Sequence, residues 1–528
     1  MDDVTTFASS AVYNIALQFS FRVFTFAFNG YLFSVIANNE LIGVANVRLM
    51  LLYTTLSFLV REPFRRSGIQ RIKQKDAQWS QFINFLWLCP LMALPVSFLL
   101  ILVWIWVLSP PDPTTVPFYA ESVLCYALSL LLETLAEPLW IVAQQCRYVR
   151  LKVLIESVQV FSRSFLVLLF FLHFRDLRAF PCAMLVSSLL YTMLYLLYFL
   201  FSYSSSTLPS LWEMCPSLGS GVDPEMWGLA RSFLRHSIVK QLLTEGERYV
   251  MTLFNILDFS DQGIYDIIHN LGSLVARFLF APLEESAYNY FALTLHRDKP
   301  AKQQDPEKFP LATKVLCTLL KLTMLVGLMM CAFGIGYSWL ALHLYSFGKE
   351  TLTQGAGPTL LRWYCGYVLL LALNGITECF AFAAMRKEQV DRHQSFLVVF
   401  CCVFVVVSIL LTHNFGSIGF VWANCINMLL RILYSVSFIN KFYHDLPSVR
   451  PLSHLWPSPQ LVVALLLSLF FTLLSNQIFC CQGFFNTAAH LAVGAFCLFA
   501  VMTTIYGTDR ELVEFIEEFV VRSKLKRG

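Results

Sequence analysis

Four charged residues interrupt an apolar stretch near the middle of the chain. In "VKQLLTEGERYVMTLF", residues 239–254, they are Lys240, Glu245, Glu247 and Arg248. On a helix, Glu245 and Arg248 are three residues apart, and Lys240 precedes Glu247 and Arg248 by seven and eight residues, so these side chains share one face. If the stretch crosses a membrane, that face has to meet a protein interior or a water-filled cavity, because lipid does not solvate charge.

The composition indicates that the stretch does lie in a membrane. Apolar residues make up 57% of the 528 residues and charged residues only 14%, whereas a soluble domain carries about a quarter. The apolar residues form segments of roughly 20, the length that crosses a hydrocarbon core of about 30 Å. We therefore predict an all-α polytopic membrane protein with about 14 transmembrane helices, at 9–36, 41–62, 80–108, 118–143, 153–172, 181–203, 233–257, 262–292, 311–336, 359–384, 394–412, 416–440, 458–477 and 487–506.

The distribution of Lys and Arg predicts the orientation of these spans. Alternate loops and the tail hold 25 of the 38 basic residues, and the opposite loops hold three. Short cytosolic loops are enriched in Lys and Arg, so the basic loops and both termini are predicted to be cytosolic. The other ten basic residues fall within spans, and they are Arg22, Arg48, Arg163, Lys240, Arg248, Arg277, Lys314, Lys321, Arg362 and Arg431.

These intramembrane charges suggest a cavity for an anion. A charge at mid-membrane costs roughly 2.5–3.5 kcal/mol on insertion scales, so it normally faces a bundle interior. For Lys314, Lys321 and Arg362 we favour the other interpretation, that they reach the interface from helix ends. The predicted substrate-binding cavity, basic on balance, consists of Arg22, Arg48, Lys240, Glu245, Glu247, Arg248, Arg277, Glu284, Glu285 and Arg431.

A second group of basic residues is predicted to form a cytosolic rim. Its members are Arg61, Arg65 and Arg66 of "REPFRR", together with Lys152. Two interpretations stand for this motif: it collects a phosphate, or it only anchors the span by the positive-inside rule. Likewise, the intramembrane acids line a site or simply pair with basic neighbours and hold helices together.

Two weak internal similarities predict a repeat. Residues 38–66 align with 258–286, matching Gly43 to Gly263, and residues 133–145 align with 374–386, matching Glu137 to Glu378. Half-length repeats are typical of transporters. The predicted domains are an N-terminal six-helix lobe (1–203), a cytosolic linker rich in Ser, Pro and Gly (204–232), a C-terminal six-helix lobe (233–440), helices 13 and 14 (458–506) and a basic cytosolic tail (507–528).

The chain contains no pattern typical of an enzyme. It has no Walker A run, no HExxH, no GxSxG and no zinc-like pairing of its 15 cysteines;. We predict no catalytic residue, no metal, no cofactor, no ATP site and no nucleic-acid partner. The enzyme alternative is a glycosyltransferase that uses dolichol-linked donors, but the predicted luminal loops carry few acidic residues, and Asp258 and Asp261 form their only close pair.

Four stretches resemble a known family. They are "NVRLMLLYTTLSFLVREPFRR" (46–66), "KQLLTEGERYVMTLFNILDFSDQGIYDIIHNLGSLVARFLFAPLEES" (240–286), "LLALNGITECFAFAAM" (370–385) and "VWANCINMLLRI" (421–432). They are similar to signature stretches of the eukaryotic dolichol-linked oligosaccharide translocation proteins, in the multidrug/oligosaccharidyl-lipid/polysaccharide flippase superfamily. The resemblance implies residence among the lipids of the endoplasmic reticulum membrane and a two-lobed helical fold.

The resemblance also implies a ligand and an activity. The ligand is a heptasaccharide of five mannoses and two N-acetylglucosamines on dolichol pyrophosphate. The activity is its transfer from the cytosolic to the luminal leaflet for N-glycosylation. Arginine suits the pyrophosphate because it makes bidentate contacts. Two alternatives stay open: an accessory factor that binds the glycolipid without transporting it, and a cation-coupled antiporter, which the basic cavity disfavours.

The orientation can be tested by cysteine accessibility on a background without exposed thiols. Because the loop at 61–79 is basic, a Gln74→Cys variant should be labelled from the cytosol;. An Asp112→Cys variant should be labelled only from the lumen. Labelling of the two positions from the opposite sides would contradict the predicted topology.

Overall fold

In the computed structural model, every regular element of the described residues is helical, and no strand occurs among them. Ten helices in this part of the chain are long and apolar enough to cross a membrane. The prediction of an all-α polytopic membrane protein is therefore confirmed, whereas the count of 14 spans is not. The described residues are 24, 26–36, 38–70, 79–146, 148–201, 209–217, 219–297, 299–348, 352–446, 451–480, 483–510 and 512–514.

The ten helices coincide with predicted spans. One of them contains two, the spans at 394–412 and 416–440, because Gly416 has φ 58° and ψ −143° and interrupts an otherwise continuous helix. The first predicted span, 9–36, lies largely outside the described residues, and its described part is helical over Phe26–Val35. The ten are Asn39–Ile69, Trp79–Val107, Tyr119–Gln145, Arg150–Phe174, Ala179–Phe201, Lys308–Tyr345, Gly357–Ala384, Glu388–Phe442, Pro459–Phe479 and Phe484–Thr508.

Two predicted spans are broken into shorter helices. The span at 233–257 corresponds to α9 (Pro224–Thr244) and α10 (Gly246–Phe254), which are separated at Glu245. The span at 262–292 corresponds to α11 (Phe259–Gly272), the π-helix η6 (Ala276–Phe280) and α12 (Ala281–Thr294). Both spans contain charged residues of the predicted cavity, and π-helical turns of this kind are frequent at functional sites.

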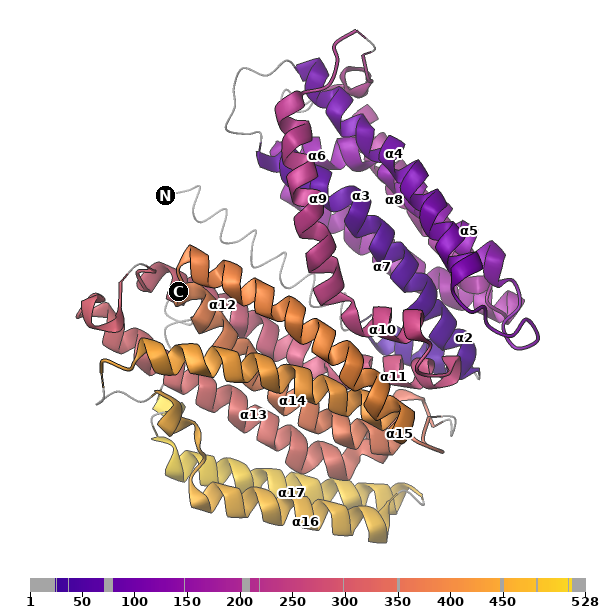
Figure 1. Ribbon diagram of the computed structural model, residues 1–528. Coiled ribbons are helices and arrows are strands. Elements are labelled where there is room, and N and C mark those ends of the chain that lie inside the picture. The colour runs from indigo at the N-terminus through magenta and orange to yellow at the C-terminus, as the bar shows by residue number, and fades with distance from the viewer. Residues whose placement is uncertain are drawn as a thin grey trace. The chain divides into compact units, whose positions relative to one another are not determined.

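Contacts divide the chain into two compact units (Figure 1). The first unit is Met1–Gly263 with Tyr345–Phe347. Within it, α3 packs against α4 and α9, and α8 packs against α5 and α7. Besides α9 and α10, its elements are α2 (Asn39–Gly43), η1 (Val44–Leu49), α3 (Met50–Gln70), α4 (Trp79–Leu102), η3 (Val103–Val107), α5 (Tyr119–Thr134), α6 (Glu137–Gln145), α7 (Val149–Phe174), α8 (Ala179–Phe201) and η5 (Leu211–Met214).

The second unit is Ile264–Leu344 with Gly348–Gly528. Its strongest pairings are α14 with α15, α16 with α17, and α12 with α14. Helices α16 and α17 lie side by side, in yellow in Figure 1. Helix α11 belongs to this unit only from Ile264 onward. Besides that part of α11, η6 and α12, its elements are η7 (Ala301–Gln303), α13 (Lys308–Tyr345), α14 (Gly357–Ala384), α15 (Lys387–Phe442), η8 (Pro451–Leu455), α16 (Pro459–Phe479) and α17 (Phe484–Thr508).

The division between the units differs from the predicted domain boundary. We placed residues 233–257 with the second lobe, but α9 packs along α3 and groups with the first unit. The described part of the predicted linker also packs on the first unit. Met214 is buried in the core of the first unit, and its carbonyl accepts a hydrogen bond from Trp87 Nε1 at 2.7 Å. Residues 211–217 and 219–222 of the predicted linker therefore lie against the first unit, and we call them the docked segment.

Two glycines that the predicted repeat aligns are in contact within the first unit. A Cβ atom built on Gly43 would lie 2.0 Å from the carbonyl oxygen of Phe259, and one built on Gly263 would lie 2.2 Å from that of Asn39. No side chain fits at either position, so the two backbones approach each other as only glycine allows. This contact joins α2 to the start of α11.

Gly43→Ala should therefore destabilise the protein, because the added methyl group collides with backbone that cannot move aside. We expect a lower midpoint of thermal unfolding, measured in detergent or nanodiscs. Gly366→Ala, in α14, is the control, because a Cβ atom there meets nothing within 4 Å. Alanine favours a helix over glycine by up to about 1 kcal/mol, so the control should be neutral or stabilising. Equal midpoints for the two variants would contradict the close contact.

Candidate functional site

The first unit contains a buried cluster of two arginines and two glutamates, which we call the Arg61 cluster. Arg61 of α3 donates from Nη1 to Glu133 Oε2 at 2.8 Å and from Nε to Glu137 Oε1. Arg65, one turn later, donates to both carboxylate oxygens of Glu137 at 2.8 Å. Both carboxylates are almost fully buried. Two permanent cations thus balance two carboxylates. Arg65 binds Glu137 in the bidentate geometry that makes such pairs strong, whereas Arg61 bridges the two glutamates;.

Further polar groups complete the Arg61 cluster. Glu133 also accepts hydrogen bonds from the Tyr53 hydroxyl at 2.6 Å, from Gln159 Nε2 at 2.6 Å and from the Ser188 hydroxyl at 2.7 Å. Tyr191 accepts from Arg61 Nη2 at 3.3 Å. The cluster therefore links α3, α5, α6, α7 and α8. Ionised groups can be buried in this way only because each of them has hydrogen-bond partners within the protein.

The predicted cytosolic rim has to be corrected for Arg61 and Arg65. Arg61 is only 8% exposed and its donors are engaged by the glutamates and Tyr191. Arg65 stacks on the Trp140 ring at 3.9 Å, and Lys152 Nζ lies 5.1 Å from the same ring. Arg66 is more exposed and pairs with Glu62. Within the described structure, Arg61 and Arg65 therefore hold helices together and do not form an open rim.

Arg48 is a buried cation without a carboxylate partner among the described residues. It lies in the π-helix η1 and is 1% exposed. Its Nη1 donates to the carbonyl of Ser109, and its guanidinium lies 5.1 Å from the Phe259 ring and 5.9 Å from the Tyr119 ring. Its Nε and Nη2 have no hydrogen-bond partner in the described structure. A buried guanidinium with two free donors is suited to an anion.

The charges of residues 239–254 are paired within the first unit. Lys240 Nζ lies 3.6 Å from Glu62 Oε1, and Arg248 Nη1 lies 3.1 Å from Glu245 Oε2. Because the helix is interrupted at Glu245, Lys240 belongs to α9, and Glu247 lies in the first turn of α10 with Arg248. The single helical face that we predicted for these residues is therefore wrong, although α9 does face α3.

The second unit holds another buried cluster, which we call the Glu378 cluster. Glu378 of α14 accepts hydrogen bonds from Arg431 Nη2 at 2.6 Å and from Asn374 Nδ2 at 2.9 Å. His393 Nε2 lies 3.4 Å from its other oxygen, and that imidazole is fully buried. Glu284 of α12 lies against the same helix, since its Oε1 would be 1.8 Å from a Cβ built on Gly375.

The structure thus brings together some of the predicted site residues. Arg431 binds Glu378, and Glu284 lies against Gly375 on the same helix. Arg277 instead donates to the carbonyl of Asn270, and Glu285 is exposed. Arg22 lies outside the described residues. That all of these residues line one cavity stays a prediction. Sequence reasoning missed His393, Tyr53 and Gln159 as members of the clusters, although Glu133 and Glu137, spaced i, i+4 in an apolar span, marked the place.

Solved structures with the same fold are membrane transporters. A structure titled "Lipid II flippase MurJ, inward closed conformation" matches with a TM-score of 0.63 and 13% identity, over 95% of this chain and 100% of that one. An inward-facing multidrug resistance MATE family transporter matches with a TM-score of 0.59 and 13% identity, over 81% of this chain and 99% of that one. At such low identity these matches define the class of fold alone.

The chain belongs to the Rft protein family, whose model matches residues 6–518. A relative from Mus musculus, named Man(5)GlcNAc(2)-PP-dolichol translocation protein RFT1, is 43% identical over 525 residues, covering 97% of this chain and 96% of the relative. A protein of the same name from Xenopus tropicalis is 40% identical, covering 98% of this chain and 97% of the relative. The family resemblance of the sequence motifs is thereby confirmed.

Arg61→Ala should destabilise the protein strongly, because it leaves Glu133 and Glu137 buried with one cation between them. Breaking a buried ion pair from one side costs about 3–5 kcal/mol. Arg66→Ala is the matched control on the same helix, since its pair with Glu62 is partly exposed and such pairs are worth about 0–1 kcal/mol. Thermal unfolding in detergent measures both, and similar midpoints would mean that the Arg61 cluster does not carry stability.

Proposed function

We propose that the protein transfers dolichol-pyrophosphate-linked heptasaccharide, five mannoses on two N-acetylglucosamines, from the cytosolic to the luminal leaflet of the endoplasmic reticulum. The observation that carries this proposal is the match, over 97% of the chain at 43% identity, to a relative named for translocation of that glycolipid. The solved structures of the same fold are titled as a flippase and a transporter, and a fold of this class is compatible with movement of a ligand across a bilayer.

The chemistry of the ligand agrees with the buried cations. A pyrophosphate brings about two negative charges, which arginine binds better than lysine because its planar guanidinium makes two parallel hydrogen bonds. Arg48 supports the proposal most directly, because it has two free donors and no carboxylate beside it among the described residues. Arg61 and Arg65 are weaker candidates for ligand contacts, since their donors are occupied by Glu133 and Glu137.

The proposed mechanism is alternating access without ATP, because the sequence contains no nucleotide-binding motif. Each compact unit carries its own buried charge cluster, centred on Glu137 in the first and on Glu378 in the second. These clusters tie neighbouring spans together, which favours movement of each unit as a body over bending within it. Under this proposal the glycolipid enters from the cytosolic side, where the predicted basic loops lie.

Reconstitution in liposomes tests the proposal. The measured quantity is the rate at which the heptasaccharide lipid of the inner leaflet becomes accessible to a mannose-binding lectin added outside. Arg48→Ala should slow this rate roughly tenfold or more, because hydrogen bonds to charged groups contribute about 1.5–3 kcal/mol. Arg277→Ala should slow it as well if Arg277 lines the cavity. Lys308→Ala, an exposed cation paired with Asp305, is the control.

The same assay separates the transporter from the accessory factor. If liposomes without the protein transfer the lipid equally fast, while cells that carry Arg48→Ala accumulate the heptasaccharide lipid and underglycosylate secreted proteins, the transporter proposal is wrong. A factor that binds or escorts the glycolipid would then explain the requirement. Thermal unfolding of Arg48→Ala, run in parallel, distinguishes loss of ligand binding from loss of the fold.

A further inference from the structure

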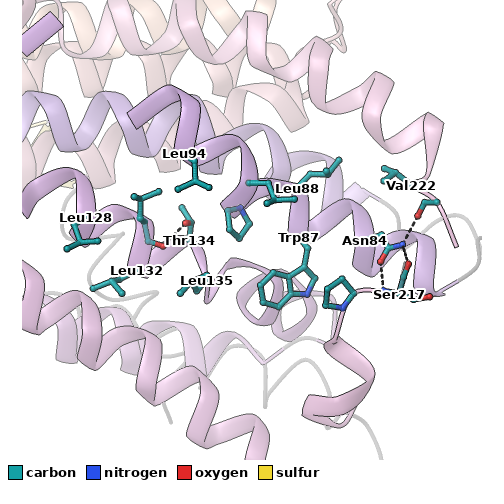
Figure 2. A pocket seen from close by; sticks show the side chains of 15 residues that line it. Asn84, Trp87, Leu88, Leu94, Leu128, Leu132, Thr134, Leu135, Ser217 and Val222 are labelled. Atoms are coloured by element: carbon teal, nitrogen blue, oxygen red, sulfur yellow. Dashed lines mark hydrogen bonds between the residues drawn. The ribbon is translucent and has the colours of Figure 1, made fainter. Parts of the chain in front are cut away.

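A deep apolar groove lies on the first unit between α4, the end of α5 and the docked segment of the linker (Figure 2). Its volume is about 730 Å³. All of its lining residues belong to the first unit. They are Asn84, Trp87, Leu88, Pro90, Leu91, Leu94, Leu128, Leu131, Leu132, Thr134, Leu135, Pro216, Ser217, Gly221 and Val222.

Each wall of the groove contains a place where regular backbone hydrogen bonding is interrupted. Pro90 lies inside α4 and lacks a backbone N–H donor;. On the other wall, α5 ends at Thr134, and α6 begins at Glu137 after a turn. Both irregular places line the groove. The two walls therefore do not close against each other along their full length.

The mouth of the groove is lined by exposed apolar side chains. Leu91, Leu94 and Leu128 are 60%, 55% and 49% exposed, and they lie on helices that are long and apolar enough to span the membrane. Only 28% of the most apolar part of Trp79–Val107 is buried in the protein. Exposed apolar surface on a membrane-spanning helix is covered by lipid. The chain of a membrane lipid is therefore the occupant that the apolar part of the groove favours.

One end of the groove is polar. Asn84 donates to the carbonyls of Ser217 and Gly221, each at 2.7 Å, and accepts from the Ser217 backbone N–H at 2.8 Å. These bonds, drawn in Figure 2, hold the docked segment over the groove. No charged residue lines the groove. It can therefore hold an uncharged chain, whereas a pyrophosphate would find no cation in it.

We propose that this groove binds the polyprenyl chain of the glycolipid while the lipid lies in the cytosolic leaflet. The inference rests on the proposed function and on the predicted orientation. The lining residues 84–94 occupy the first half of the span 79–107, which follows the basic, predicted cytosolic loop at 61–79. The groove thus opens into the leaflet from which the substrate is taken. Holding the chain there would keep the headgroup near the protein before transfer.

Photolabelling in liposomes tests the proposal. One probe is a polyprenyl pyrophosphate oligosaccharide with a diazirine in its chain, and the other is a phosphatidylcholine with a diazirine in an acyl chain. The polyprenyl probe should label peptides that contain residues 84–94 or 128–135. Leu91→Trp and Leu128→Trp fill the groove and should reduce this labelling at least fivefold. Leu99→Trp is the control, because Leu99 lies on α4 like Leu91, is 61% exposed and is outside the groove. This variant should leave the labelling unchanged.

Two results would overturn the proposal. The first is equal labelling in the groove-filling variants and in Leu99→Trp, which would mean that the chain binds elsewhere. The second is labelling of the groove by the phosphatidylcholine probe that excess polyprenyl lipid does not compete away, which would identify an ordinary acyl chain as the occupant. Transfer rates measured on the same liposomes keep the two proposals apart. Groove labelling without any transfer would refute the proposed function and leave the binding site standing.

Discussion

The fold depends on one constraint: a charge placed within the hydrocarbon has to be neutralised inside the protein, because no water is available there. Arg61 and Arg65 meet this constraint with Glu133 and Glu137, and the bonds that result fix how α3, α5 and α6 are rotated about their axes. Gln159 and Ser188 donate to the other oxygen of Glu133, and Tyr53 donates to the oxygen that Arg61 also contacts. In the second unit, the buried charge of Glu378 is compensated by Arg431 and lies beside His393. A second carboxylate, that of Glu284, lies against the helix that carries Glu378, at Gly375.

Much of this architecture could be predicted from the sequence, because length, hydropathy and the charge of loops act over whole segments. The pairing of charges could not, since it depends on which way each helix is turned. Arg61 illustrates the difference. We ended its helix at residue 62, which put the arginines at an open rim, but α3 continues to Gln70 and its last turns are covered by the core of the first unit. Hydropathy shows where apolar sequence stops and not where burial stops.

The linker shows the same limit on a smaller scale. A composition rich in Ser, Pro and Gly predicts a flexible linker. An average composition does not reveal the two residues whose contacts attach this linker to the first unit. Met214 enters the core, and Asn84 on α4 holds the backbone on either side of the turn at 217–221. Similarly, the charges of residues 239–254 were recognised, but not the break at Glu245 that divides them between two helices. A single buried side chain or one helix break is too local a feature to alter a segment average.

The Arg61 cluster also has a consequence for the biogenesis of the protein. Its members enter the bilayer at different times, since α3 is synthesised before α5 and α6, and α7 and α8 come later still. Until the partners arrive, the arginines of α3 have to stay near the interface or in a polar environment supplied by the insertion machinery, because an uncompensated charge at mid-membrane costs roughly 2.5–3.5 kcal/mol. The charges of α3 are therefore neutralised only when the helices synthesised after it are in place, so the position of α3 in the bilayer is coupled to theirs;.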